Sequence, residues 1–233
     1  MHKSNTTCFL DFDHTLFHTD EFFHVDVRQA FLALRIDAKE WEQSYAAVWP
    51  TGYTLEKHAE EVSRQSGSQL PLKEMKSILQ NSFSDLRRYL FPDVIPFLQR
   101  AKENGTRLYL LSFGDCEWQR YKVSACAVSA YFEDMFFATT PGGKSRLVRE
   151  QVKTIREVVL VVDNNPVDLD LIRDQAPAVR TCHMNRVPDH MRSPADDLAR
   201  RRFLEARRYL ERVPRYQHVP CRTLDVVLEE LER

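Results

Sequence analysis

Short apolar runs that end in polar residues alternate with stretches of helical periodicity along most of the chain. Such alternation is typical of a parallel sheet wrapped by helices. The expected strands cover residues 7–10, 107–111, 135–138, 158–162, 178–183 and 217–221, and helices are expected at 94–103, 145–152 and 223–231. We therefore predict an α/β fold with a doubly wound, mainly parallel, Rossmann-like sheet.

One long interval, between the first two strands, breaks this alternation. Residues 17–90 show only amphipathic helical spacing, over 25–34, 38–49, 55–66 and 72–90. An insertion of this length predicts a helical cap domain at 17–90 above the carboxyl edge of the sheet. The α/β core is then formed by residues 1–16 and 91–233. An arginine-rich stretch at 200–215 is interpreted as a solvated amphipathic helix.

Composition narrows the choice of environment and partners. The 233 residues are 43% hydrophobic and 29% charged, as in ordinary soluble globular proteins. The formal charge of −1 gives no global drive toward nucleic acid or anionic membrane. The five cysteines are odd in number and form no CxxC pair, which favours reduced core thiols over disulfides or zinc. No apolar signal region precedes the first strand and no membrane span is expected, so we predict a cytoplasmic protein.

Residues able to handle phosphate follow four of the predicted strands. Asp11 and Asp13 come after the first strand, Ser112 ends the second, Lys144 follows the third through a Gly-Gly turn, and Asp163 ends the fourth. In a doubly wound sheet, ligands bind at the carboxyl ends of the strands. Two carboxylates at alternate positions of one strand end concentrate negative charge, and the simplest partner for them is a divalent cation such as Mg²⁺.

These residues resemble the motifs of the haloacid dehalogenase-like (HAD) phosphohydrolases. Asp11-Phe12-Asp13-His14-Thr15 is similar to the DxDxT motif of that family, and Ser112, Lys144 and Asp163 with Asp168 are similar to its second, third and fourth motifs in the same order. The resemblance implies a magnesium-dependent phosphatase with an inserted helical cap, and a small phosphorylated metabolite as its substrate.

The resemblance also implies roles for the catalytic residues. Asp11 would attack phosphorus and form an aspartyl-phosphate, as carboxylate nucleophiles can. Asp13 would protonate the leaving oxygen and later deprotonate water. Ser112 and the amides of Phe113 and Gly114 would bind the phosphoryl oxygens, and Lys144 would supply positive charge.

The implied metal site consists of the Asp11 carboxylate, the Asp13 carbonyl and Asp163, which are the oxygen ligands that Mg²⁺ prefers. Thr15 is a further candidate because it completes the first motif. Asn164 stands where many members carry a second aspartate, so metal binding depends on Asp163, with Asp168 as an outer ligand or as the residue that orients Lys144.

Three alternatives remain at this point. A phosphomutase or phosphonate hydrolase would share the same machinery, and a non-catalytic binding protein could keep the fold without turnover. The third alternative is a nucleotide-binding phosphate loop at Gly143-Lys144-Ser145, which precedes a helix and follows a strand. Ala138 occupies the place of the first glycine of that loop, and a nucleotide site leaves Asp11 and Asp13 unexplained.

Overall fold

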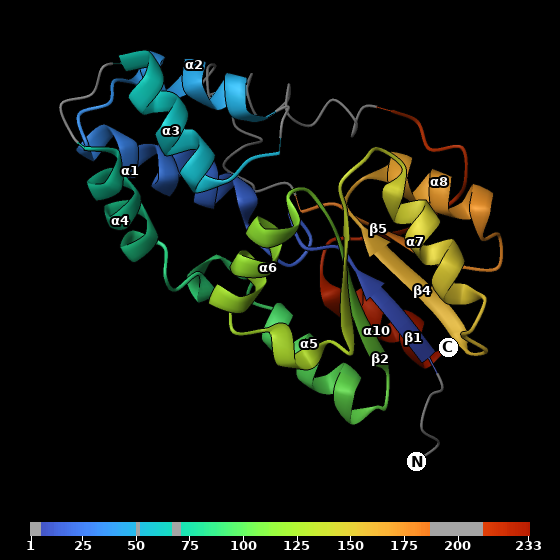
Figure 1. Cartoon of the computed structure of the whole chain (residues 1–233). Coiled ribbons are helices and arrows are strands. Elements are labelled where there is room, and N and C mark those ends of the chain that lie inside the picture. Colours follow the sequence, from blue (N-terminus) through green and yellow to red (C-terminus); the bar gives the residue numbers. More distant parts are fainter. Residues whose placement is uncertain (1–5, 50–51, 67–70, 187–211) are drawn as a thin grey trace.

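The core of the molecule is a single six-stranded sheet in which every neighbouring pair of strands is parallel. The computed structural model describes residues 6–49, 52–66, 71–186 and 212–233 (Figure 1). The strands follow the spatial order β3-β2-β1-β4-β5-β6. Their bounds are β1 Thr6–Leu10, β2 Arg107–Phe113, β3 Asp134–Ala138, β4 Val158–Asp163, β5 Arg180–Met184 and β6 Val219–Cys221. The strand order reverses next to β1, so the ends of β1, β2 and β4 lie side by side.

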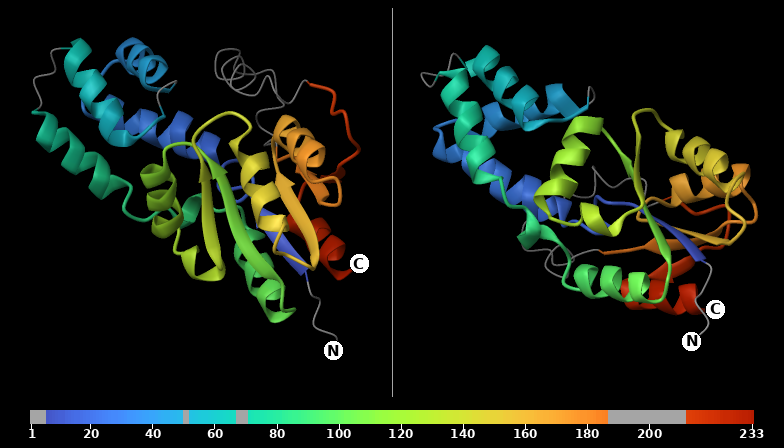
Figure 2. Two further views of the ribbon diagram at one scale, coloured as in Figure 1. Left: turned by 45° about the vertical axis from the view of Figure 1, so that its right-hand side comes forward. Right: turned by 60° about the horizontal axis from the view of Figure 1, so that its bottom comes forward.

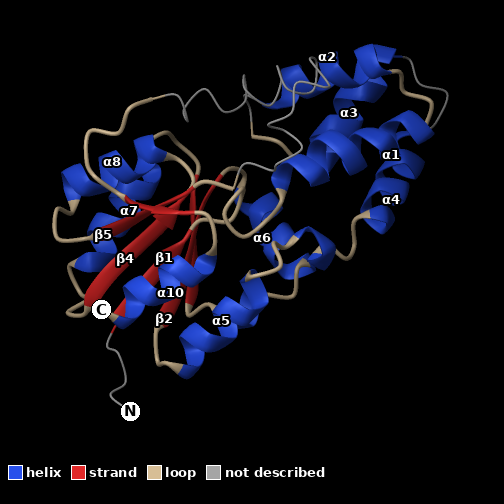
Figure 3. Ribbon diagram, turned by 180° about the vertical axis from the view of Figure 1, so that it is seen from behind, coloured by secondary structure: helices blue, strands red, loops and turns tan. Residues whose placement is uncertain are grey.

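Alternate residues of β1 face opposite sides of the sheet, and each side is covered by its own helices. Cys8 and Leu10 pack in the cluster that contains α5 (Val94–Glu103), α6 (Cys116–Ala125) and α10 (Leu224–Glu232). Phe9 packs in the cluster of α7 (Gly143–Val152) and α8 (Pro166–Gln175). The two helical layers are visible on either side of the strands in Figures 2 and 3. The predicted doubly wound α/β fold is confirmed.

Between β1 and α5 the chain is helical, and these helices extend away from the sheet (Figure 1). They are η1 (Glu21–Val27), α1 (Arg28–Ala33), α2 (Ala38–Val48), α3 (Leu55–Ser66), α4 (Leu72–Ser82) and the short η3 (Arg87–Tyr89). The chain leaves and re-enters the core at one place, where Phe17 and Leu90 form an antiparallel bridge. No helix in the described part of the chain is long and apolar enough to cross a membrane.

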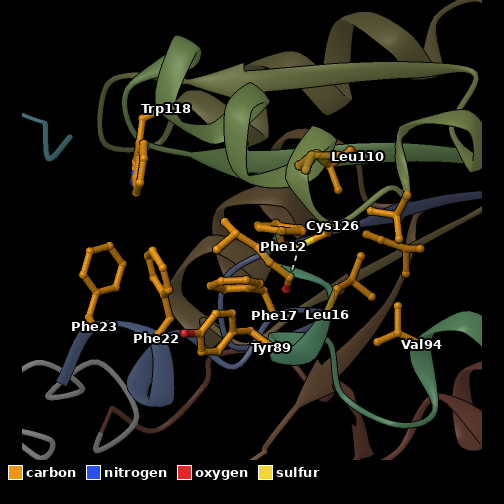
Figure 4. Close-up of a cluster of buried hydrophobic side chains, with 14 of the residues drawn as sticks. Phe12, Leu16, Phe17, Phe22, Phe23, Tyr89, Val94, Leu110, Trp118 and Cys126 are labelled. Carbon is orange, nitrogen blue, oxygen red and sulfur yellow. Dashed lines mark hydrogen bonds between the residues drawn. The ribbon is translucent and has the colours of Figure 1, made fainter. Parts of the chain in front are cut away.

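Aromatic side chains join the inserted helices to the core. Phe22 of η1 packs on Phe17, on Tyr89 and on Trp118 of α6, with ring centroids 5.1 to 6.2 Å apart (Figure 4). All four side chains are buried in the same cluster as the sheet residues Leu10 and Leu110, so that cluster is continuous across the join. Burial of several aromatic rings contributes several kcal/mol, about 2 for each ring. The root of the insertion is therefore held firmly to the core.

Two helix boundaries differ from the predictions by more than two residues. The helix expected at 72–90 ends at Ser82, because Phe83 closes α4 and turns its side chain into the aromatic cluster. The helix expected from residue 25 begins earlier, as the wide π-type turn of η1, since Phe22 and Phe23 are both needed at the join. Most of the predicted arginine-rich helix lies outside the described residues.

Candidate active site

Asp11 lies at the carboxyl end of β1 and is almost completely buried. Its backbone N–H donates to the carbonyl of Val162 at 2.9 Å, which extends the sheet by one residue. Its carboxylate accepts hydrogen bonds from Lys144 Nζ at 2.7 Å and from Thr15 Oγ1 at 2.9 Å. Only 3% of the residue is exposed. Both carboxylate oxygens are thus held in place, as expected for a side chain that must approach a substrate in one orientation.

Lys144 connects the ends of three strands. It follows the turn between β3 and α7, in which Gly142 adopts a left-handed φ of 70°. Its ammonium lies 2.7 Å from Asp11 Oδ1, 2.7 Å from Asp163 Oδ2 and 4.0 Å from Asp168 Oδ2. Three predicted site residues, Asp11, Asp163 and Asp168, therefore lie around the ammonium nitrogen of Lys144, which is itself a predicted site residue.

This cluster carries more negative than positive charge. Three carboxylates surround one ammonium, so the ionised group has a net charge of −2. Burial raises the pKa of Asp11, and the nearby Asp163 raises it further, although Lys144 opposes both effects. Burial likewise raises the pKa of Asp163 and of Asp168. An excess of buried negative charge on oxygen atoms favours the binding of a hard divalent cation.

The donor set fits Mg²⁺ in kind. Asp11 Oδ1 and Asp163 Oδ2 each lie 2.7 Å from Lys144 Nζ, so these two carboxylates lie close together, and Asp163 Oδ1 accepts the Asn165 N–H at 2.8 Å. No group of three or more His, Cys, Asp or Glu side chains forms a metal site within the described residues. The expected set contains only two such side chains and a main-chain carbonyl, because Mg²⁺ keeps several waters and takes substrate oxygens.

Asp13 has a different environment from Asp11. Lys122 Nζ of α6 lies 2.6 and 2.8 Å from its two carboxylate oxygens, and Gln119 Nε2 and Thr19 Oγ1 donate to it at 2.9 and 2.8 Å. Burial disfavours the charged carboxylate, but Lys122 and Gln119 outweigh this effect and hold the pKa of Asp13 below its usual value. These contacts favour the ionised, basic form of Asp13.

The pairing of Asp13 with Lys122 was not predicted from the sequence. Lys122 is only 1% exposed, and its ammonium lies 5.4 to 6.0 Å from the ring centroids of Phe12, Phe17 and Phe23. The sequence does contain a signal for the burial of Lys122, because this residue lies on the same face of α6 as Val123 and the C-cap residue Cys126, which are both apolar and buried.

Ser112 lies at the end of β2 and is completely buried, and its hydroxyl has no hydrogen-bond partner among the described residues. A buried hydroxyl without a partner costs free energy, so a ligand oxygen at this position would satisfy it. In the loop that follows, the Gly114 amide donates to the carbonyl of Ala138 at 2.9 Å. The binding of a phosphoryl oxygen by this amide stays a prediction. The Phe113 side chain is 47% exposed, and the role of its amide as a phosphoryl ligand stays a prediction.

The remaining candidates lie around Asp163. Asn165 caps α8 and donates its side-chain N–H to Asp168 at 3.0 Å. The Asp168 carboxylate also lies 4.0 Å from Lys144 Nζ, and its role as an outer ligand or as the residue that orients Lys144 stays a prediction. Asn164 is buried, and its carbonyl contacts His183 Nε2 at 3.2 Å.

The geometry also bears on the phosphate-loop alternative. The Gly143 N–H already donates to the carbonyl of Thr140 at 2.9 Å, so this amide is engaged within the turn, and a nucleotide site gives Asp11 and Asp13 no role. A phosphate loop needs free amides and a lysine directed at the ligand. We therefore reject this alternative. A cavity of about 290 Å³, lined by residues that include Phe91, Ile95 and Tyr131, contains none of the candidate site residues.

Comparison with known proteins identifies the fold. No protein-family model and no curated protein matches the chain. A haloacid dehalogenase-like hydrolase from Burkholderia xenovorans LB400 superposes with a TM-score of 0.68 at 14% identity, over 98% of both chains. The chain has the HAD-like fold. Two further solved structures share it at similar identity.

One of these HAD-like structures is the hydrolase YfnB of Bacillus subtilis bound to magnesium, with a TM-score of 0.60, 14% identity and coverage of 98% of this chain and 99% of that one. The other is the L-2-haloacid dehalogenase of Xanthobacter autotrophicus with covalently bound chloropropionic acid. It has a TM-score of 0.56, 15% identity and coverage of 100% and 99%. Because identities are this low, the HAD-like fold is what the three likenesses establish, and the reaction must be argued from the site.

Proposed function

We propose that this protein is a magnesium-dependent phosphatase that hydrolyses a small phosphate monoester through an aspartyl-phosphate on Asp11. The observation that carries the proposal is the second carboxylate, Asp13, which is held by Lys122, Gln119 and Thr19 two residues after the buried Asp11. A positioned carboxyl at this point can exchange a proton with a leaving group and with water.

In the proposed reaction, an Asp11 oxygen attacks phosphorus while the bond to the ester oxygen breaks, and Asp13 gives that oxygen a proton. Asp13 then takes a proton from water, and the resulting hydroxide attacks phosphorus and releases phosphate from Asp11. Lys144, bonded to Asp11 at 2.7 Å, offsets charge on the nucleophile and on the phosphoryl group. The hydroxyl of Ser112, which has no partner in the described structure, is available to a phosphoryl oxygen.

Asp11, Asp163 and the Asp13 carbonyl would hold Mg²⁺, whose charge reduces the repulsion between the carboxylate nucleophile and a phosphate dianion. The excess negative charge around Lys144 supports this assignment.

The decisive experiment is a phosphate-release screen over phosphorylated metabolites, with and without Mg²⁺. We expect hydrolysis that requires Mg²⁺ and is lost in Asp11→Asn, with the folded state checked by circular dichroism. A parallel arm measures chloride release from 2-chloropropionate. Chloride release without phosphate release would replace the phosphatase by a dehalogenase, and the absence of both activities would favour a binding protein.

A further inference from the structure

The side-chain amide of Gln119 has only one possible orientation. Its Nε2 lies 2.9 Å from Asp13 Oδ2 and 2.8 Å from the carbonyl of Phe113, and both of these atoms are acceptors. Rotating the amide by 180° would place its oxygen against two acceptors, so the contacts themselves assign nitrogen and oxygen. Gln119 thereby connects the acid/base carboxylate with the loop that follows Ser112.

The fixed orientation leaves the other end of the amide without a partner. Gln119 is only 4% exposed, and its Oε1 accepts no hydrogen bond from any described residue. Buried amide oxygens are nearly always hydrogen-bonded, because desolvation without a partner is unfavourable. An unpaired oxygen beside Asp13 is therefore expected to meet a donor when the site is occupied.

The loop is shaped to keep the amide in this place. Gly114 adopts a φ of +137°, and a Cβ built on it would lie 2.8 Å from Gln119 Nε2. Any larger residue would push the amide away from Asp13. Because Nε2 is bonded to Asp13, Oε1 lies one amide group away from the carboxylate that serves the leaving oxygen.

We propose that Gln119 Oε1 accepts a hydrogen bond from a hydroxyl group on the carbon adjacent to the phosphate ester, so that the protein selects 2-hydroxyalkyl phosphates. This inference rests on the proposed phosphatase function. A neutral hydroxyl is favoured over an ammonium, because the Lys122 ammonium contacts both oxygens of Asp13 and would repel a second cation.

The test compares three substrates that differ at a single group: 2-hydroxyethyl phosphate, ethyl phosphate and 2-aminoethyl phosphate. For the unmodified protein with Mg²⁺, we expect kcat/KM for the hydroxyl compound to exceed that for ethyl phosphate about tenfold, the size of one neutral hydrogen bond to a buried acceptor. The amino compound should not share this advantage. In Gln119→Met both rates should fall, since Asp13 loses a donor, and the ratio should approach one.

Gln175→Met is the matched control. Gln175 also has a buried Oε1 without a partner among the described residues, but its Nε2 contacts Ser145 Oγ at 3.0 Å instead of Asp13. This variant should keep the tenfold ratio. An equal preference in the unmodified protein, or a ratio that survives Gln119→Met, would overturn the inference while the phosphatase proposal stands. Failure to hydrolyse any phosphate ester would refute both.

Discussion

His58 should make the inserted helices sensitive to mild acid. Its ring is completely buried in α3, where Nε2 contacts Ser44 Oγ at 2.9 Å and Nδ1 contacts the Tyr53 hydroxyl at 3.0 Å. Trp41 and Phe31 cover the ring, with centroids 5.8 and 4.4 Å away. The neutral ring can donate through one nitrogen and accept through the other, so both polar contacts are satisfied without a charge.

Burial lowers the pKa of His58 from 6.5 to about 4. The unfolded chain therefore binds this proton more readily than the folded protein, and the free energy of unfolding falls as pH falls below 6.5. Between pH 8 and pH 5 the unfolded histidine becomes protonated while the folded one stays largely neutral. The free energy of unfolding falls by about 2 kcal/mol by pH 5 and by about 3 kcal/mol below pH 4.

The assay is urea unfolding at pH 8 and pH 5, followed by tryptophan fluorescence, for the unmodified protein and for His58→Gln. Because the substitution itself changes stability at both pH values, the quantity to compare is the loss of unfolding free energy between pH 8 and pH 5 in each protein. We expect the unmodified protein to lose about 2 kcal/mol more than the variant on going to pH 5. Equal losses would show that His58 is protonated in the folded protein as easily as in the unfolded chain, which would refute the reasoning.

Two substitutions in the candidate site have equally definite outcomes. Lys122→Met removes the ammonium that lies over the Phe12 ring and pairs with the Asp13 carboxylate. The free energy of unfolding, measured in urea, should fall by about 3 kcal/mol because the carboxylate is left without its cation. Adding Asp13→Asn should recover part of this loss, and a purely additive double mutant would argue against the ion pair. Gly114→Ala should lower the free energy of unfolding by about 1 to 3 kcal/mol and remove most of the activity. The alanine backbone would be strained at this positive φ, and its Cβ would displace the Gln119 amide. Gly142→Ala is the control, since its Cβ would meet only a side-chain atom at 3.8 Å, and it should be strained but retain the Asp13 contacts.

The sheet and much of the site could be predicted because their signals are local. An apolar run such as 158–162 specifies a buried strand, and the parallel arrangement then brings the residues that follow each strand to one edge. In this way Asp11, Lys144 and Asp163 were expected together, and in the structure Lys144 donates hydrogen bonds to both carboxylates. Their catalytic roles stay predictions.

The contacts of Asp13 could not be predicted in the same way. Lys122 is separated from Asp13 by 109 residues, and its reach depends on how α6 is rotated against the sheet, which sequence periodicity does not specify. The occupied amide of Gly114 was missed for a similar reason, because the backbone of the loop bends toward Ala138 of the neighbouring strand. Backbone hydrogen bonds in loops depend on tertiary positions rather than on residue type.

The two aspartates of the first motif thus lie in opposite electrostatic environments. Asp11 shares one lysine with two other carboxylates and has a raised pKa, whereas Asp13 has Lys122 to itself and a lowered one. The proposed chemistry requires the reverse, an ionised nucleophile and a protonated acid. Binding supplies the missing charges, because a divalent cation beside Asp11 would favour its ionised form and a phosphate dianion beside Asp13 would favour its protonated form. The proposed reaction therefore requires a cation beside Asp11 and a phosphate ester beside Asp13 at the same time.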